Sequence, residues 1–297
     1  MTPEISWESL IGSIGIDRFE AAHFGRQSLH VKQAFVPSTG LEDLNQWRSS
    51  LRGQETTREA HRGRLEIDPK VDTTQPIGPE LEDLVTQGGP LIIGAINKIN
   101  PAIESLARTI AKGLGSFVGV NAYLSPPRKD ALDLHYDDHD VIVLQLAGEK
   151  LWTLGKRIAR GVARSKFFRA DQDALKARAI AQDTFHSFAI GPGDLLYLPR
   201  GLFHRATARH DVSIHLSFGI RRPTGLDFAN LVMQRLIADV GVREYAPRLN
   251  AKTSDAEVLI YLDQLRDRIQ SIISDDTTRV EFLEQYRTQF DGVTDRH

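Results

Sequence analysis

Two histidines and an aspartate have the residue types and the spacing to bind a metal ion. His135 and Asp137 stand two positions apart in DLHYDDHDVIV, and on a β-strand this spacing would place both side chains on one face. An imidazole and a carboxylate that converge on one point suit a divalent first-row metal. Two histidines and one carboxylate on one face are typical of non-haem Fe(II) oxygenases, in which the open positions accept a 2-oxo acid and O2.

The third ligand must come from another segment, and His204 is the candidate. It follows a turn, an apolar strand and a tight Pro-Arg-Gly turn in the sequence GPGDLLYLPRGLFHRATA. An isolated His-x-Asp pair is most often a chance match. Its combination with a strand, a turn and a histidine inside a β-rich region favours a metal site at His135, Asp137 and His204.

His139 is the alternative ligand, because His135, Asp137 and His139 would share one face of a strand. Three successive side chains on one face span about 13 Å of strand, which is too far for all of them to meet one metal ion. We therefore expect His139 to line the pocket or to be a satisfied polar residue. Asp138 and Asp140 are expected to point to the opposite face.

A 2-oxo acid with a second carboxylate also needs a cation, and Lys150 is the candidate. It follows an Ala147-Gly148 turn, and we expect its strand to return antiparallel beside the metal-binding strand. Most lysines are solvated surface residues. In EKLWTL, however, Lys150 is the lone cation of an apolar strand, which favours a buried role.

A β-rich region from 116 to 220 must position these residues. Short apolar runs alternate there with turn signals such as SPPRKD, AGE, GPGD and PRG. Several short strands at such spacing are typical of a β-sandwich or barrel. The predicted strands are FVGVNAYL, DVIVLQL, KLWTL, HSFAI, DLLYLP and VSIHLSFGI. The tract from 158 to 182 interrupts them and is predicted to be a loop with a helix.

The flanking regions are mainly helical in pattern. Apolar spacing predicts helices over 5–24 and 101–114, a strand over 27–37, and short strands and loops over 48–79. After Pro223 the period is helical again, with capping boxes predicted at Ser254 with Glu257 and at Thr278 with Glu281. We therefore predict two domains, a catalytic domain over 1–222 and a helical region over 223–297.

The overall composition is that of an ordinary globular protein, with 41% hydrophobic and 26% charged residues. No cysteine is present, which excludes thiolate zinc sites, iron–sulfur clusters and cysteine nucleophiles. The net charge of -2 gives no reason to expect nucleic-acid binding. We see no signal peptide and no apolar run of membrane-spanning length, so a cytoplasmic location without membrane partners is expected.

Three motifs, NAYLSPP, HYDDHDVIVLQLAGEKLW and GDLLYLPRGLFHRA, resemble those of the JmjC-type 2-oxoglutarate oxygenases. Within that superfamily the sequence is most similar to the ribosomal oxygenases, which hydroxylate arginine or histidine in ribosomal proteins. The resemblance extends from about Ser9 to Arg222 and includes DRFEAAHFGRQSLHVKQ near the start. It implies a mainly β fold, a double-stranded β-helix of the cupin or jelly-roll type, with N-terminal helices and a C-terminal helical region.

The resemblance also implies a role for particular residues. The family's metal ligands fall on His135, Asp137 and His204. Its lysine for the distal carboxylate of 2-oxoglutarate falls on Lys150. The Asn and Tyr that flank this co-substrate fall on Asn121 and Tyr123. A small hydroxyl residue late in the barrel often assists, and Ser213 or Ser217 could serve. The implied cofactor is Fe(II), with 2-oxoglutarate and O2 as co-substrates.

The resemblance further implies a partner and a substrate class. The helices after Thr224 resemble the region through which these oxygenases dimerise, so a homodimer is expected. We expect no counterpart of the family's C-terminal winged-helix-like module within these 297 residues. Hydroxylation of an arginine or histidine in a protein is therefore one expectation, and hydroxylation of a small molecule or of a free or carrier-bound amino acid is the other.

Three further functions compete with hydroxylation. A metal-dependent cupin isomerase or epimerase would share the barrel, but such cupins usually supply H-x-H followed by a glutamate. Here an aspartate stands in the middle, and no glutamate lies between Asp140 and Gly148. A non-enzymatic binding module would have lost its iron ligands, whereas the triad and Lys150 are intact here. Lysine demethylation uses the same iron chemistry, but the motifs resemble those of the hydroxylases.

Overall fold

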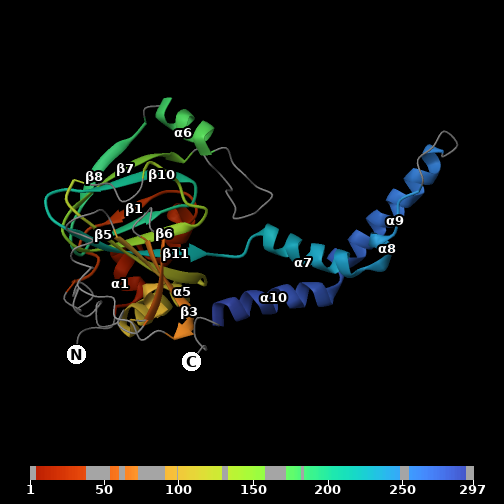
Figure 1. Cartoon of the computed structure of the whole chain (residues 1–297), viewed down its shortest axis with the longest axis horizontal. Coiled ribbons are helices and arrows are strands. Elements are labelled where there is room, and N and C mark those ends of the chain that lie inside the picture. The colour runs from red at the N-terminus through yellow and green to blue at the C-terminus, as the bar shows by residue number, and fades with distance from the viewer. Residues whose placement is uncertain are drawn as a thin grey trace. The chain divides into compact units, whose positions relative to one another are not determined.

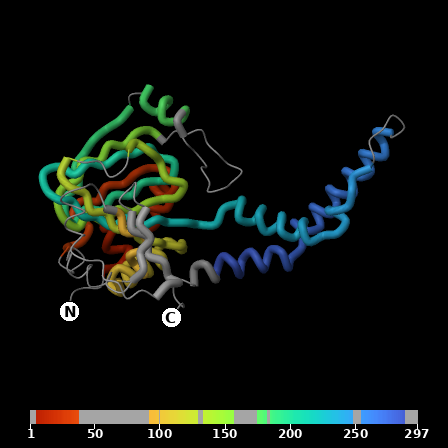
Figure 2. Tube along the Cα trace, in the orientation of Figure 1, coloured from red at the N-terminus to blue at the C-terminus, as the bar shows by residue number. Residues whose placement is uncertain are grey.

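The computed structural model describes residues 5–37, 54–59, 64–72, 91–98, 100–128, 133–157, 172–181, 184–247 and 254–291. Figure 2 traces the chain from its N-terminus in red to its C-terminus in blue. The chain divides into two compact units, Met1–Arg221 and Arg222–His297. The residues considered above as ligands all belong to the first unit.

The first unit is built on two β-sheets. Among the described residues, the larger sheet has the strand order β1-β9-β6-β11-β5-β4-β3-β2, and the smaller sheet has the order β10-β7-β8. All neighbouring strands are antiparallel except the pair of β3 and β4. The strands of the larger sheet are β1 (Leu29–Val31), β2 (Gln54–Glu59), β3 (Arg64–Asp72), β4 (Leu91–Gly94), β5 (Phe117–Ser125), β6 (Asp140–Ala147), β9 (Leu195–Leu198) and β11 (Ser213–Arg221). Those of the smaller sheet are β7 (Lys150–Arg157), β8 (His186–Ile190) and β10 (Leu202–Ala208).

The two sheets lie face to face and enclose the core of the unit (Figure 1). Apolar side chains from both sheets form one buried cluster: Val141, Val143, Trp152, Leu154, Ile190, Leu196, Leu198 and Leu202. Burying apolar side chains of this size supplies most of the free energy of folding, at about 25 cal/mol per Å² removed from water. Two mainly antiparallel sheets that share one core are the architecture of the predicted double-stranded β-helix, which is confirmed.

The strand predictions between 116 and 220 are largely confirmed, and one pairing prediction is wrong. Strands β6 and β7 are joined by the short turn at Gly148, yet they do not pair with each other. Strand β6 lies between β11 and β9, whereas β7 crosses to the smaller sheet and lies between β10 and β8. Lys150 therefore reaches the core from the opposite sheet and not from a neighbouring strand.

The N-terminal helix prediction over 5–24 is correct in position but wrong in continuity. Gly12 and Gly15 have positive φ angles of 54° and 74°, and they divide the segment into short helical pieces. These pieces are α1 (Trp7–Ile11), η1 (Gly12–Ile14), α2 (Ile16–Arg18) and η2 (Phe19–His23). The strand predicted over 27–37 is limited to β1, and Gln33, with a φ of 46°, lies in the turn that follows it.

The remaining helix of this region, α5 (Pro101–Leu114), matches the prediction. Asn100 caps its N-terminus by accepting hydrogen bonds from the amides of Ala102 and Ile103, and Gly115 ends it in a left-handed conformation. A short 3-10 turn, η4 (Ile96–Lys98), precedes it. Strands β2 and β3 agree with the short strands predicted within 48–79, and α6 (Gln172–Ala181) is the helix predicted within 158–182. The other residues of those two tracts lie outside the described residues.

The second unit is helical, as its apolar pattern predicted. It contains α7 (Gly225–Ala238), α8 (Val240–Arg243), α9 (Asp255–Ser274) and α10 (Asp276–Asp291). The capping box at Ser254 and Glu257 is confirmed. The one at Thr278 is wrong, because Asp275 accepts the Thr278 amide hydrogen bond at 3.0 Å and the helix has already begun at Asp276. Among the described helices, none combines the length and the apolar character that a membrane crossing requires.

Candidate metal centre and adjoining cavity

His135, Asp137 and His204 meet at one point in the first unit. His135 and Asp137 lie in the segment just before β6, and His204 lies near the start of β10. Each side chain offers one ligand atom, and the three atoms lie within 4.8 Å of one another. A single ion could therefore contact a ring nitrogen of His135, a carboxylate oxygen of Asp137 and a ring nitrogen of His204.

The predicted strand geometry of His135 and Asp137 is wrong, although the residues do converge. Only His135 forms a β-bridge, with His204, through backbone hydrogen bonds of 3.1 and 2.8 Å. The backbone carbonyl of Asp137 then accepts a hydrogen bond from the Gly201 amide at 2.9 Å. The segment is thus fastened to the turn before β10, and this attachment brings the three side chains together.

Hydrogen bonds to the backbone orient both imidazoles. Nδ1 of His135 lies 2.6 Å from the carbonyl oxygen of Asp133, and Nδ1 of His204 lies 3.0 Å from that of Leu202. A carbonyl oxygen only accepts, so each Nδ1 donates and each ring leaves Nε2 as its lone-pair nitrogen. This is the arrangement by which metal-binding histidines are fixed in proteins. Nε2 of His204 lies 3.6 Å from a carboxylate oxygen of Asp137, so the donor set fits a divalent cation.

Burial keeps His204 neutral. Desolvation, with a smaller contribution from the nearby His135, lowers the pKa of His204 to about 4 against the opposing effect of the Asp137 carboxylate. A neutral imidazole is the form that binds a metal ion. The protein therefore holds His204 ready to bind a cation throughout the physiological pH range.

His139 is held away from the three converging side chains by contacts that strand geometry did not anticipate. Its Nδ1 lies 2.8 Å from the carboxylate of Asp138, and its ring packs on Gly219 so closely that a Cβ there would come within 2.9 Å of the imidazole. Asp140 is buried and accepts hydrogen bonds from the Tyr197 hydroxyl and the Arg200 amide, at 2.7 and 3.1 Å. Asp138 and Asp140 thus have structural partners.

A small apolar cluster packs against the two segments that carry the predicted metal ligands. Tyr136, between His135 and Asp137, meets Phe203, which precedes His204, edge to face with ring centroids 5.1 Å apart. Ala179 of α6 completes the buried cluster. Leu134, Leu175 and Phe185 pack against it. The helix inserted between β7 and β8 therefore packs against both ligand segments.

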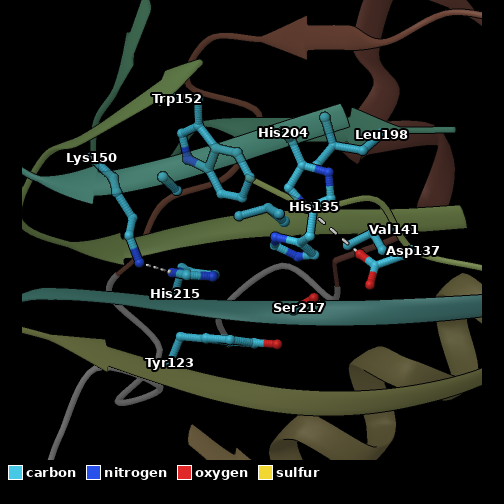
Figure 3. Close-up of a pocket in the computed structure, with 12 residues that line it drawn as sticks. Tyr123, His135, Asp137, Val141, Lys150, Trp152, Leu198, His204, His215 and Ser217 are labelled. Atoms are coloured by element: carbon cyan, nitrogen blue, oxygen red, sulfur yellow. Dashed lines mark hydrogen bonds and ion pairs between the residues drawn. The ribbon is translucent and has the colours of Figure 1, made fainter. Parts of the chain in front are cut away.

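A cavity opens beside the three converging side chains. It is lined by Tyr123, His135, Asp137, Val141, Val143, Lys150, Trp152, Leu198, His204, Ala206, His215 and Ser217. Figure 3 shows Lys150 on one side of it and His135, Asp137 and His204 on the other. The lining thus combines a cation, a candidate metal centre and apolar walls.

Lys150 is fully buried, with an exposed fraction of 0%. Its ammonium donates to the Ser125 hydroxyl at 2.8 Å and to Nδ1 of His215 at 3.2 Å. Ser125 and His215 are neutral, so they orient the ammonium without cancelling its charge. A buried ammonium in this setting fits an anionic ligand, because a charge-assisted hydrogen bond is strong away from water.

Two aromatic residues of the cavity, His215 and Trp152, were not anticipated from the sequence. His215 stacks on Tyr123 with ring centroids 4.7 Å apart and an interplanar angle of 7°. Trp152 meets His215 edge to face at 5.9 Å, and its buried indole N–H finds no acceptor among the described residues. Strand parity could have indicated both, since Trp152 alternates with Lys150 and His215 lies between the two serines that were considered.

Of the four other residues predicted to contact the co-substrate, two line the cavity and two do not. Tyr123 and Ser217 line the cavity, whereas Asn121 and Ser213 are not among its lining residues. The side-chain oxygen of Asn121 accepts a hydrogen bond from the Ala95 amide at 3.1 Å. Ser213 is buried, and its hydroxyl accepts from the Gln145 amide at 2.8 Å.

Comparison with known proteins finds similar sequences for this region. Residues 97–228 match the JmjC domain family. Ribosomal oxygenase 1 of Rattus norvegicus is 31% identical over 173 residues, which cover 56% of this chain and 28% of that protein. The bifunctional lysine-specific demethylase and histidyl-hydroxylase NO66 of Dictyostelium discoideum is 36% identical over 120 residues, covering 40% and 22% respectively. This chain thus spans about a third or less of the length of these two relatives.

The fold has a counterpart among solved structures. The ribosomal oxygenase YcfD from Escherichia coli, in complex with cobalt and 2-oxoglutarate, superimposes with a TM-score of 0.57 at 17% identity. The match covers 92% of this chain and 70% of that one. The resemblance to JmjC proteins and ribosomal oxygenases that the three motifs indicated is therefore confirmed.

Proposed function

We propose that the JmjC domain of this chain is an Fe(II)- and 2-oxoglutarate-dependent dioxygenase that hydroxylates an amino-acid side chain, arginine or histidine, in a protein. One observation carries the proposal. Three ligand atoms converge within 4.8 Å at one side of a cavity whose other side holds a buried ammonium. A metal and a dicarboxylic 2-oxo acid together need these two features at opposite sides of one cavity.

His135, Asp137 and His204 would hold the iron. Their donor set, two imidazoles and a carboxylate, is the one that leaves positions open on Fe(II) for other ligands. Bound Fe(II), with 2-oxoglutarate and O2, would supply the oxidising chemistry. The backbone bonds at both Nδ1 atoms would keep the two Nε2 atoms directed at the ion.

Lys150 would bind the distal carboxylate of 2-oxoglutarate, with Ser125 orienting the ammonium. Tyr123 and Ser217 are the candidate hydroxyl partners, since both line the cavity. Asn121 and Ser213 would have supporting roles. Asn121 would hold the Ala95 amide beside β5, and Ser213 would hold the side-chain amide of Gln145 in place. Val141, Val143 and Leu198 form apolar walls that would exclude water, which strengthens each polar contact inside.

The relatives support a protein as the substrate. Two of them bear the names ribosomal oxygenase and histidyl-hydroxylase. The test is to incubate purified protein with Fe(II) and 2-oxoglutarate and with extract of cells that lack it. Peptide and metabolite fractions are then searched for products heavier by the mass of one oxygen atom. A peptide product on arginine or histidine supports the proposal, and a product confined to metabolites favours the small-molecule alternative.

Lysine demethylation is a second candidate, because one relative is named both a demethylase and a histidyl-hydroxylase. Methylated and unmethylated forms of one peptide, offered together, separate the two reactions. Release of succinate from 2-oxoglutarate separates any such oxygenase from a cupin isomerase or a binding module. Hydroxylation stays the first proposal.

We also infer a cytoplasmic homodimer that uses the helical region. No described residue of α9 is buried, and its apolar side chains Leu259, Ile260 and Leu262 are about half exposed or more, at 60, 58 and 49%. Single exposed apolar residues are ordinary, but several on one helix favour a partner surface. We place the oxygenase domain in residues 1–222 and this region in 223–297.

A further inference from the structure

His215 is a cavity residue to which the proposed chemistry gives no role. It lies in the middle of β11, opposite Tyr123 of β5 and Gln145 of β6. Its ring is nearly parallel to that of Tyr123, and Trp152 approaches it from the other sheet. Packing on both sides fixes the plane of the imidazole. A fixed ring in a cavity can position a neighbouring charge.

The contact with Lys150 fixes the protonation of His215. Nδ1 of His215 lies 3.2 Å from the ammonium nitrogen of Lys150. An ammonium only donates, so Nδ1 must accept, and the ring is then neutral with its proton on Nε2. Figure 3 shows that the nitrogen joined to Lys150 is on one edge of the ring and the other nitrogen is directed away from it.

The environment agrees with this protonation state. Burial, and after it the charge of Lys150, lowers the pKa of His215 well below its ordinary value. The Ser125 hydroxyl contacts the same ammonium at 2.8 Å. A lysine side chain has several rotatable bonds, and two fixed acceptors restrict the ammonium to one place.

We propose that His215 is a positioning residue for the co-substrate, because its Nδ1 holds the Lys150 ammonium where the distal carboxylate of 2-oxoglutarate binds. The inference rests on the proposed function. It predicts selectivity: His215 should matter for a 2-oxo acid that carries a distal carboxylate and not for one that lacks it. A residue that only fills space would affect both ligands alike.

The experiment uses the full chain loaded with Mn(II), which holds the co-substrate without turnover. Isothermal titration calorimetry measures the Kd of 2-oxoglutarate and of 2-oxopentanoate, which has the same carbon chain and a methyl group in place of the distal carboxylate. The variants are His215→Phe, which keeps a ring against Tyr123, and His215→Asn, which keeps a polar atom near the position of Nδ1. His186→Phe is the matched control, because His186 is an exposed histidine of β8.

For His215→Phe we expect the Kd of 2-oxoglutarate to rise roughly 10- to 100-fold, as for the loss of a hydrogen bond to a charged group. The Kd of 2-oxopentanoate should change less than about 3-fold, and His215→Asn should recover much of the 2-oxoglutarate affinity. Equal weakening of both ligands, or no weakening, would overturn the inference. If the wild-type protein does not prefer 2-oxoglutarate, the proposed function itself fails, and the inference fails with it.

Discussion

At the scale of single residues, the cavity depends on two histidines that are neutral for different reasons. His204 is neutral chiefly because it is buried, and its Nδ1 donates to a backbone carbonyl. His215 is neutral because it is buried beside an ammonium to which its Nδ1 must be an acceptor. The first arrangement leaves a lone pair for a cation, and the second supports a cation already present.

The neutral state of His215 predicts a pH dependence of stability. In the unfolded chain His215 gains a proton near its ordinary pKa of about 6.5, but the folded protein resists protonation until a much lower pH. The unfolded state therefore binds more protons as the pH falls below about 6.5, and the free energy of unfolding decreases. His215→Phe removes this contribution, which amounts to at most about 1.4 kcal/mol per pH unit.

Urea unfolding of the metal-free proteins at about pH 7.5 and about pH 5 measures this effect. The wild type should lose more stability than His215→Phe over this range. Equal losses in the two proteins would show that His215 does not stay neutral when folded.

The sequence predicted the residues with distinctive chemistry and missed those that depend on packing. His135, Asp137 and His204 could be chosen because their types and order are rare in combination, and the three do converge. Lys150 could be chosen because a cation is unusual in an apolar strand. His215 was overlooked although strand parity groups it with Ser213 and Ser217, because its role depends on its contact with Lys150 from the other sheet.

At the scale of elements, the cluster of Tyr136 and Phe203 links α6 to the candidate metal centre. Both residues adjoin proposed ligands in the sequence, so their packing determines where the ligand segments lie. Phe203→Ala removes a buried ring, and we expect a loss of about 3–5 kcal/mol in stability. We also expect weaker metal binding, since His204 follows directly.

Chelator competition for Mn(II) at a temperature where the variant stays folded measures that second effect. Phe117→Ala is the control, because Phe117 is 44% exposed on β5. Wild-type metal affinity in Phe203→Ala would show that the cluster supports the fold alone.

The turn between β6 and β7 carries the chain from the larger sheet to the smaller sheet, which contains Lys150. Gly148 has a φ of 64°, and a Cβ there would lie 2.4 Å from the carbonyl oxygen of Val212. Gly148→Ala should therefore lower the free energy of unfolding by roughly 1–3 kcal/mol. Gly191→Ala is the matched control, since nothing lies within 4 Å of the added atom and its φ is ordinary. Chemical denaturation of both variants tests the prediction, and equal stability would contradict it.

Element positions could largely be predicted from the sequence, but pairing could not. Short apolar runs bounded by turn signals located β5, β6 and β11, because each strand buries one face or both. The same pattern does not encode partners, and a short turn normally joins paired strands. The prediction that β6 and β7 pair was therefore wrong. The N-terminal helix was predicted as continuous because apolar spacing ignored the positive φ angles of Gly12 and Gly15.

At the scale of the whole molecule, the chain consists of two units whose surfaces differ. The first buries its apolar strands, whereas α9 of the second leaves Leu259 and Leu262 exposed. If these side chains form the proposed homodimer, the double variant Leu259→Glu and Leu262→Glu should shift the protein to monomers. Light scattering coupled to size exclusion measures the mass.

The control for that variant is Arg266→Glu together with Asp263→Arg, which alters exposed charges on the same helix and leaves its apolar residues in place. Far-ultraviolet circular dichroism should show that both double variants keep their helices. A wild type that is monomeric at micromolar concentration, or a glutamate variant that stays dimeric, would contradict the assignment of α9 to the interface.

The central claim is that His135, Asp137 and His204 bind the iron on which turnover of 2-oxoglutarate depends. The most direct measurement follows bound iron and succinate formation in the same samples of wild type, His204→Ala, Asp137→Ala and the control His186→Phe. Wild type and control should bind iron and release succinate, whereas both triad variants should lose iron and form none. A triad variant that retains wild-type iron content and wild-type turnover would contradict the claim.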